Sequence, residues 1–208
     1  MATSLTLEND SSLAQGYLKV NGSTAATLTT SGITGNLTGN VTGNLTGSLT
    51  AGGSLTLATA QTATGTSVDF TGIPSWAKRI TVMFNGVSTS GTTNILIQLG
   101  VSGTPETSGY TSVGNVVTAA GVSQVTSIAG FIIYAGTDSY SQNGAFRLNN
   151  IASNTWVADG VLCNTTTQSY TAFIAGSKAL AGTLNMIRIT NTGSDTFDAG
   201  TINISYEG

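Results

Sequence analysis

Residues 79–100, RITVMFNGVSTSGTTNILIQLG, contain two segments in which apolar and polar side chains alternate. The apolar side chains take every second position, as in Ile80, Val82 and Phe84 and again in Ile95, Ile97 and Leu99. A period of two is typical of a strand with one buried face, and the Ser-, Gly- and Thr-rich residues between the segments favour a turn. This stretch therefore predicts two β-strands joined by a loop.

Six more short segments continue this pattern toward the C-terminus, separated by Gly, Asn, Ser and Asp. They span residues 127–136, 144–151, 155–164, 169–177, 184–192 and 200–207. The composition agrees, because Thr, Val and Ile suit pleated surfaces, whereas charged residues, which long helices favour, make up only 7% of the chain. We therefore expect an all-β protein whose C-terminal part is a β-sandwich with jelly-roll topology.

The character of the sequence changes near residue 60. No charged side chain occurs between Lys19 and Asp69, and the first aromatic residue after Tyr17 is Phe70. Since aromatic side chains supply much of a protein core, the residues in between cannot form a conventional one. The boundary is expected within residues 58–66, and the chain is expected to have three parts, residues 1–32, 33–60 and 61–208.

The second part contains a tetrapeptide repeat, ITGNLTGNVTGNLTGSLTAGG, at residues 33–53. Its aliphatic side chains recur at every fourth residue, at Ile33, Leu37, Val41, Leu45 and Leu49. A helix would have a similar spacing, but the Gly, Thr and Asn of each unit lower helix propensity by about 2 kcal/mol relative to Ala. A lone extended strand would leave its backbone unpaired.

Association of identical chains removes both difficulties. If the chains wind about a common axis, the five aliphatic side chains meet in the interior and Gly permits the backbones to approach closely. We therefore predict a homotrimeric β-structured shaft with these five residues as its core. The alternative is a flexible polar linker, although a linker has no need to hold its aliphatic residues at a fixed interval.

The first part predicts a small β-structured segment. Leu5 and Leu7 alternate with polar residues before the turn-like sequence ENDSS, and Asn21-Gly22 is a strong hairpin signal between two runs of strand-forming residues. Because this segment is short and precedes the shaft, it is a candidate attachment module.

Charge and hydropathy exclude several kinds of partner. The net charge is −3 and the six Lys and Arg residues are scattered, whereas phosphate binding needs clustered cations. No stretch approaches 18 apolar residues, so we expect no membrane insertion. The N-terminus lacks a basic region followed by an apolar run, so no secretory signal is expected.

Three stretches of the sequence resemble bacteriophage fibre and other virion structural proteins. They are GYLKVNGSTAATLTTSGITG (16–35) with the GNLTGN units that follow it, VDFTGIPSWAKRITVMFNGVSTSGTTNILIQLG (68–100), and LNMIRITNTGSDTFDAGTINISYE (184–207). The resemblance covers most of the chain and implies a trimeric virion fibre with an N-terminal anchor and a C-terminal β-sandwich head.

Catalytic chemistry has little support in the sequence. The chain has no histidine, which excludes Ser-His and Cys-His nucleophilic systems. Ser177 and Lys178 are adjacent, so in a strand they would face opposite ways and could not form a dyad. Asp195 and Asp198 form a close pair, but their Gly- and Ser-bounded position favours a role in shaping a turn over catalysis or calcium binding. We expect no enzymatic activity, no cofactor and no metal site.

Three polar loops are candidates for contact with a host surface: residues 86–93, 101–115 and 135–144. Two of them contain tyrosines, Tyr110 and Tyr140, which offer stacking and hydrogen bonding at low entropic cost. Trp76 and Trp156 are instead expected to be buried, Trp76 near the junction with the shaft.

These patterns favour a structural virion protein whose partners are other copies of itself, other virion proteins at its N-terminus, and host glycan or protein at its head. The alternative is a capsid decoration protein, or head fibre, that stabilises the particle without binding a receptor.

Overall fold

The structure, a computed structural model, describes the backbone of four strands between residues 5 and 34, and residues 55–136, 140–164 and 169–208. All the regular secondary structure described is β-strand, which confirms the all-β prediction. The chain divides into two units, Met1–Gly47 and Ser48–Gly208, which are described separately below.

The first unit contains a four-stranded antiparallel sheet in chain order, β1 (Leu5–Asp10), β2 (Gln15–Val20), β3 (Ser23–Thr29) and β4 (Gly32–Thr34). Val20 pairs with Ser23, so the strands that flank Asn21-Gly22 form the expected hairpin. Ile33 lies in β4, paired with Leu28. The other four residues of the predicted shaft core lie outside the described residues: Leu37, Val41, Leu45 and Leu49.

Two antiparallel sheets make up the second unit. The larger has nine strands: β5 (Thr56–Leu57), β6 (Gln61–Thr62), β8 (Arg79–Thr89), β11 (Tyr110–Thr118), β12 (Gly121–Ser127), β14 (Gln142–Ala152), β15 (Thr155–Asn164), β16 (Tyr170–Ala179) and β18 (Phe197–Glu207). The smaller has five: β7 (Val68–Thr71), β9 (Ile95–Val101), β10 (Thr104–Pro105), β13 (Phe131–Ile133) and β17 (Leu184–Asn191).

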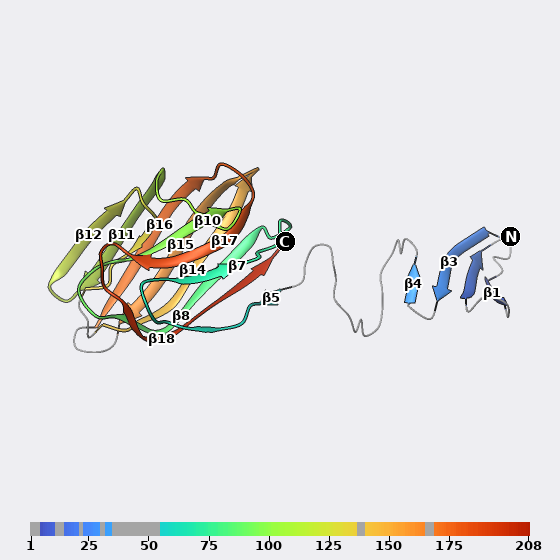
Figure 1. The fold of residues 1–208 in the computed structure, drawn as a ribbon, viewed down its shortest axis with the longest axis horizontal. Helices are drawn as coiled ribbons and strands as arrows, with labels where there is room; N and C mark the ends of the chain where they lie inside the picture. The colour runs from blue at the N-terminus through green and yellow to red at the C-terminus, as the bar shows by residue number, and fades with distance from the viewer. Residues whose placement is uncertain are drawn as a thin grey trace. The chain divides into compact units, whose positions relative to one another are not determined.

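A single hydrophobic core lies between these sheets, as in a β-sandwich. Figure 1 shows β7 and β17 of the smaller sheet in front of the strands of the larger one. Phe131 of the smaller sheet and Phe146 of the larger sheet are both fully buried, with ring centroids 5.3 Å apart. Along β8, β15 and β17 the buried residues largely alternate with exposed or half-buried ones, as the period of two predicts, whereas β9 is buried on both faces from Ile95 to Gly100.

Strand pairing in the sandwich is nested. β8 pairs with β18, β9 pairs with β17, and β11 pairs with β16, so early strands meet late ones in reverse order. The outer pair and the third pair lie in the larger sheet, whereas the second pair lies in the smaller one. Between β8 and β18 the chain therefore crosses between the sheets several times, after β8, β10, β12, β13, β16 and β17.

The sandwich has two ends, which we call the junction end and the far end. At the junction end, Thr56 of β5 pairs with Tyr206, close to Arg79 at the start of β8. β8 then runs for 11 residues, so its last residue lies about 33 Å away at the far end. There Val87 pairs with Gln142, and the main-chain N–H of Ala135 donates to the Asn94 side chain.

All eight predicted strand segments of the sandwich are found, as β8, β9 and β13–β18. Several details differ from the sequence analysis. β5, at residues 56–57, belongs to the sandwich through its pairing with β18, although residues 33–60 were assigned to the shaft. Parts of all three predicted polar loops are strand, because β8 extends to Thr89, β10 and the start of β11 lie within 101–115, and β14 begins at Gln142. The short strands β6 and β7 and the edge strand β12 were not predicted.

Candidate functional site

Tyr110 is a structural residue and not an exposed contact residue, which corrects the sequence prediction. Its side chain is only 3% exposed and lies at the start of β11, facing the core. The hydroxyl group accepts a hydrogen bond from the Leu99 main-chain N–H at 2.7 Å and donates to the Glu106 carbonyl oxygen at 3.0 Å. These bonds connect β9, β11 and the segment after β10, so Tyr110 links the two sheets.

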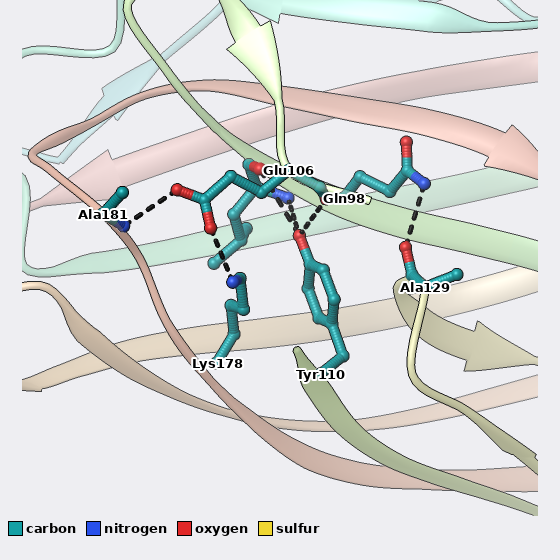
Figure 2. A network of polar contacts seen from close by, with 7 residues as sticks. Gln98, Glu106, Tyr110, Ala129, Lys178 and Ala181 are labelled. Carbon is teal, nitrogen blue, oxygen red and sulfur yellow. Dashed lines mark hydrogen bonds and ion pairs between the residues drawn. The ribbon is translucent and has the colours of Figure 1, made fainter. Parts of the chain in front are cut away.

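Next to Tyr110 lies a buried ion pair, which Figure 2 shows. The Lys178 Nζ atom of β16 is 2.5 Å from a carboxylate oxygen of Glu106, and the Lys178 side chain is only 6% exposed. The other carboxylate oxygen accepts a hydrogen bond from the Ala181 main-chain N–H at 2.8 Å. Nζ also lies 5.2 Å from the centroid of the Tyr110 ring, within range of a cation–π interaction.

This arrangement holds the segment after β10 against the end of β16. Glu106 directly follows β10 of the smaller sheet, whereas Lys178 lies near the end of β16 in the larger sheet. The ion pair thus ties the two sheets together at the junction end. Gln98 of β9 holds the segment between β12 and β13, because its side-chain amide donates to the Ala129 carbonyl oxygen at 2.9 Å.

The pKa values follow from this environment. Burial alone would raise the pKa of the Glu106 carboxyl group, but its bonds to Lys178 and to the Ala181 N–H hold that pKa below the usual value of 4.5. Burial also raises the pKa of the Tyr110 hydroxyl, which therefore stays protonated and remains a hydrogen-bond donor.

We expect the protein to lose stability in acid. A carboxyl group whose pKa is lowered by folding stabilises the folded state above its unfolded pKa, and this contribution disappears as the pH falls through the folded pKa. For Glu106 the loss should begin below about pH 4.5. Thermal melts at pH 7, 5, 4 and 3 test this: the melting temperature should hold between pH 7 and 5 and fall at pH 4 and 3. In a Glu106→Gln variant the fall should be smaller, and an equal fall would contradict a role for Glu106.

Asp195 lies in the turn before β18, where the sequence predicts a shaping role for both aspartates, whereas Asp198 is the second residue of β18 itself. Asp195 accepts hydrogen bonds from the Thr93 main-chain N–H at 2.9 Å and from the Thr93 hydroxyl at 2.6 Å, which lower the pKa of its carboxyl group. Asp198 accepts a hydrogen bond from the Ser88 hydroxyl. The two carboxylates therefore bind different partners and fix different parts of the far end.

The structure separates the three predicted contact loops. Residues 86–93 and the described part of 135–144 lie together at the far end, joined by Asn94. Residues 101–109 lie at the junction end, where Glu106 is held. Tyr140 is half-buried at the far end with its ring centroid 5.4 Å from that of Tyr170, so its role in surface contact stays a prediction.

Other predicted positions are resolved more simply. Lys178 faces the core and the neighbouring Ser177 is half-buried on the opposite face, which confirms that they do not face one another. Trp156 is buried, as expected, with 4% of its surface exposed. Trp76 was expected to be buried but is only half-buried; it lies at the junction end, with its ring centroid 5.6 Å from that of Tyr206.

A polar hollow of about 350 Å³ at the junction end contains the adjacent cations Lys78 and Arg79. The charge of Arg79 is already paired, because its guanidinium lies 2.9 Å from a Glu207 carboxylate oxygen and 3.2 Å from the Asn149 side-chain oxygen. The hollow is therefore nearly balanced in charge and does not form a phosphate-binding groove.

Among the described residues, no three Cys, Asp or Glu side chains are grouped so that they could hold a metal ion. In the same part of the chain there is also no helix of sufficient length and apolarity to cross a membrane.

Compared with known protein families, curated proteins and solved structures, the chain matches none. Its function is therefore argued from its own sequence and geometry.

Proposed function

We propose that the protein is a non-enzymatic virion structural protein that forms a homotrimeric fibre. Residues 1–32 would anchor the fibre to other virion proteins, the repeat within residues 33–60 would form its shaft, and the sandwich would be the head that contacts the host surface. The four-stranded sheet in the first unit supports the presence of a small folded segment before the repeat.

The observation that carries this proposal is that the two ends of the sandwich differ: the chain enters at one end, and most of the predicted contact loops lie at the other. The chain leaves the repeat and joins the sandwich at the junction end, through β5. Two of the three polar loops predicted to touch the host lie about 33 Å away, at the far end. In a head built in this way these loops lie at the end opposite to the one at which the chain enters, as an adhesin requires.

The nested pairing of β8 with β18, β9 with β17, and β11 with β16 supports a jelly-roll topology for the head. A jelly roll consists of two Greek keys in two packed sheets, in which strands distant in sequence become neighbours.

The mechanism is multivalent adhesion to a glycan or protein on the host surface. Each head would bind weakly, and three heads in each fibre, with several fibres in each particle, would raise the overall avidity 10²- to 10⁴-fold without any new contact. In this proposal the far-end loops, including Tyr140, bind the host surface.

Adsorption of particles that lack the protein tests the proposal. If the protein is an adhesin, such particles should adsorb to host cells at least about tenfold more slowly, while their resistance to heat and osmotic shock is unchanged. Particles that adsorb normally but lose heat resistance would contradict adhesion and favour the alternative role of a capsid decoration protein.

A further inference from the structure

The exposed large hydrophobic side chains are unevenly distributed. In the part of the sandwich that the structure describes, all of them lie in strands of the nine-stranded sheet or directly beside one. Val122 is 69% exposed, Val161 50%, Phe173 47% and Val117 43%. Single exposed apolar residues are normal on protein surfaces, but a one-sided collection indicates an interaction face.

Strand register brings these side chains together. Val161 of β15 is paired with Phe173 of β16, and Val117 of β11 is paired with Val122 of β12. Phe173 pairs with Asn115, so Val117 is its diagonal neighbour on the same face, within reach of a large side chain.

The row continues in the other direction, because Val161 pairs with Ala145 and Ala145 pairs with Met83. We call these six residues the apolar band: Met83, Ala145, Val161, Phe173, Val117 and Val122. The band crosses six neighbouring strands, from β8 to β12, on the face of the large sheet that points away from the core.

The charges beside the band are paired, which limits the cost of burying them. Arg147 and Asp159, which lie beside the band, are paired with each other at 2.6 Å across β14 and β15. A buried charge is costly when it has no partner, and here each charge keeps its partner after the face is covered.

The size of the face suits a second protein surface. Six strands at a spacing of about 4.8 Å and a length of about nine residues at 3.3 Å each give roughly 700 Å². One partner in a standard protein–protein interface contributes about 800 Å². The area is thus close to that needed for a stable association.

We propose that the apolar band is the surface through which the sandwich domains of separate copies of this chain pack against one another. This inference rests on the proposed homotrimer, and it identifies where the heads meet. A second copy is the partner that the chain itself supplies at high local concentration, since the repeat would hold the copies side by side. In the trimer each copy would turn this face toward the shared threefold axis, so that its band contacts the bands of both neighbours while the far-end loops remain free.

The full-length protein with Phe173→Glu tests this inference. The variant introduces an unpaired carboxylate in the middle of the band, so the dissociation constant of the assembly, measured by sedimentation, should rise at least about 30-fold. Thr71→Glu is the control, because Thr71 is an exposed position on the smaller sheet and should leave the assembly unchanged. Val161→Lys is a second variant, and thermal melts establish that each variant is folded.

Cys163 provides an independent measurement. It is the single cysteine of the chain and lies half-buried in β15, two residues after Val161 on the same face. In the native assembly its alkylation by a maleimide should be at least about tenfold slower than in Phe173→Glu. If the repeat alone keeps the variant trimeric, this acceleration still reports that the heads have separated, and it supports the inference.

The possible failures are distinguishable. Suppose that the wild type is trimeric, that Phe173→Glu is equally associated, and that Cys163 reacts at the same rate in both. This result would show that the band is not the surface where the heads meet, and it would leave the fibre proposal standing. In that case the face would be open to a different partner. A monomeric wild type would instead contradict the proposed homotrimer itself.

Discussion

Replacing Glu106 with alanine should lower the free energy of unfolding by about 3 kcal/mol. Lys178 is 6% exposed, and its ammonium group is 2.5 Å from the Glu106 carboxylate. Without that carboxylate a buried charge has no partner, and breaking a buried pair in this way costs about 3–5 kcal/mol. We expect the lower end of this range, because Glu106 is 23% exposed and water can reach part of the vacated space. Urea denaturation at pH 7 measures the change.

Glu207→Ala is the matched control for this variant. Glu207 pairs with Arg79 at 2.9 Å, but the two side chains are 39% and 56% exposed. Surface ion pairs contribute about 0–1 kcal/mol, so this variant should lose little stability. A loss at Glu106 as small as that at Glu207 would contradict the buried pair. The double variant Glu106→Gln with Lys178→Met should regain most of the loss, since it removes both charges together.

The strands of the sandwich could be predicted because their inner faces are regular. In β8, Ile80, Val82 and Phe84 all face the core, and the pattern stays recognisable although the outward-facing Met83 between them is apolar. The turns between strands are equally clear, because Gly, Asn and Ser gather there. In these segments the residues that the sequence pattern places on the inner face are the ones that the fold buries.

β11 was only partly foreseen because its inner face is not apolar. Ser112 and Gly114 are buried between Tyr110 and Val116, so the alternation that marks a half-buried strand is lost. The Ser112 hydroxyl is satisfied by the Ile132 main-chain N–H, which donates to it at 2.9 Å. This partner comes from β13, and no local pattern indicates it.

One member of the Glu106–Lys178 ion pair could be recognised from the sequence. Tyr170, Ala172 and Ile174 occupy inward positions of β16, and the same period places Lys178 inward. An inward-facing lysine requires a carboxylate partner. The sequence could thus show that a partner exists, but the choice of Glu106, 72 residues earlier, depends on how β10 and β16 are brought together.

The apolar band was missed for a related reason. An outward-facing Val161 or Phe173 has the same local appearance as a core residue, because both strand faces contain apolar side chains at these points. Only the register shows that they form one row and that the row lies on the outer face.

Replacing Phe131 with alanine should destabilise the sandwich by about 4 kcal/mol. Phe131 is fully buried in β13, and its ring centroid lies 5.2 Å from that of Tyr110 and 5.3 Å from that of Phe146. Phe→Ala substitutions in cores cost about 3–5 kcal/mol, through lost burial and the cavity that remains. Collapse into this cavity is limited, because Tyr110 is held in place by its hydrogen bonds to Leu99 and Glu106.

The control is Ile128→Ala, since Ile128 is 74% exposed and should contribute less than about 0.5 kcal/mol. Both variants are compared with the wild type by urea denaturation at one protein concentration, because association would otherwise shift the apparent stability. Phe131→Leu should lose less than half as much as Phe131→Ala, since it retains most of the volume. A loss below about 1.5 kcal/mol for Phe131→Ala would mean that the two sheets do not pack around this ring. It would also contradict the buried position of Tyr110 against Phe131.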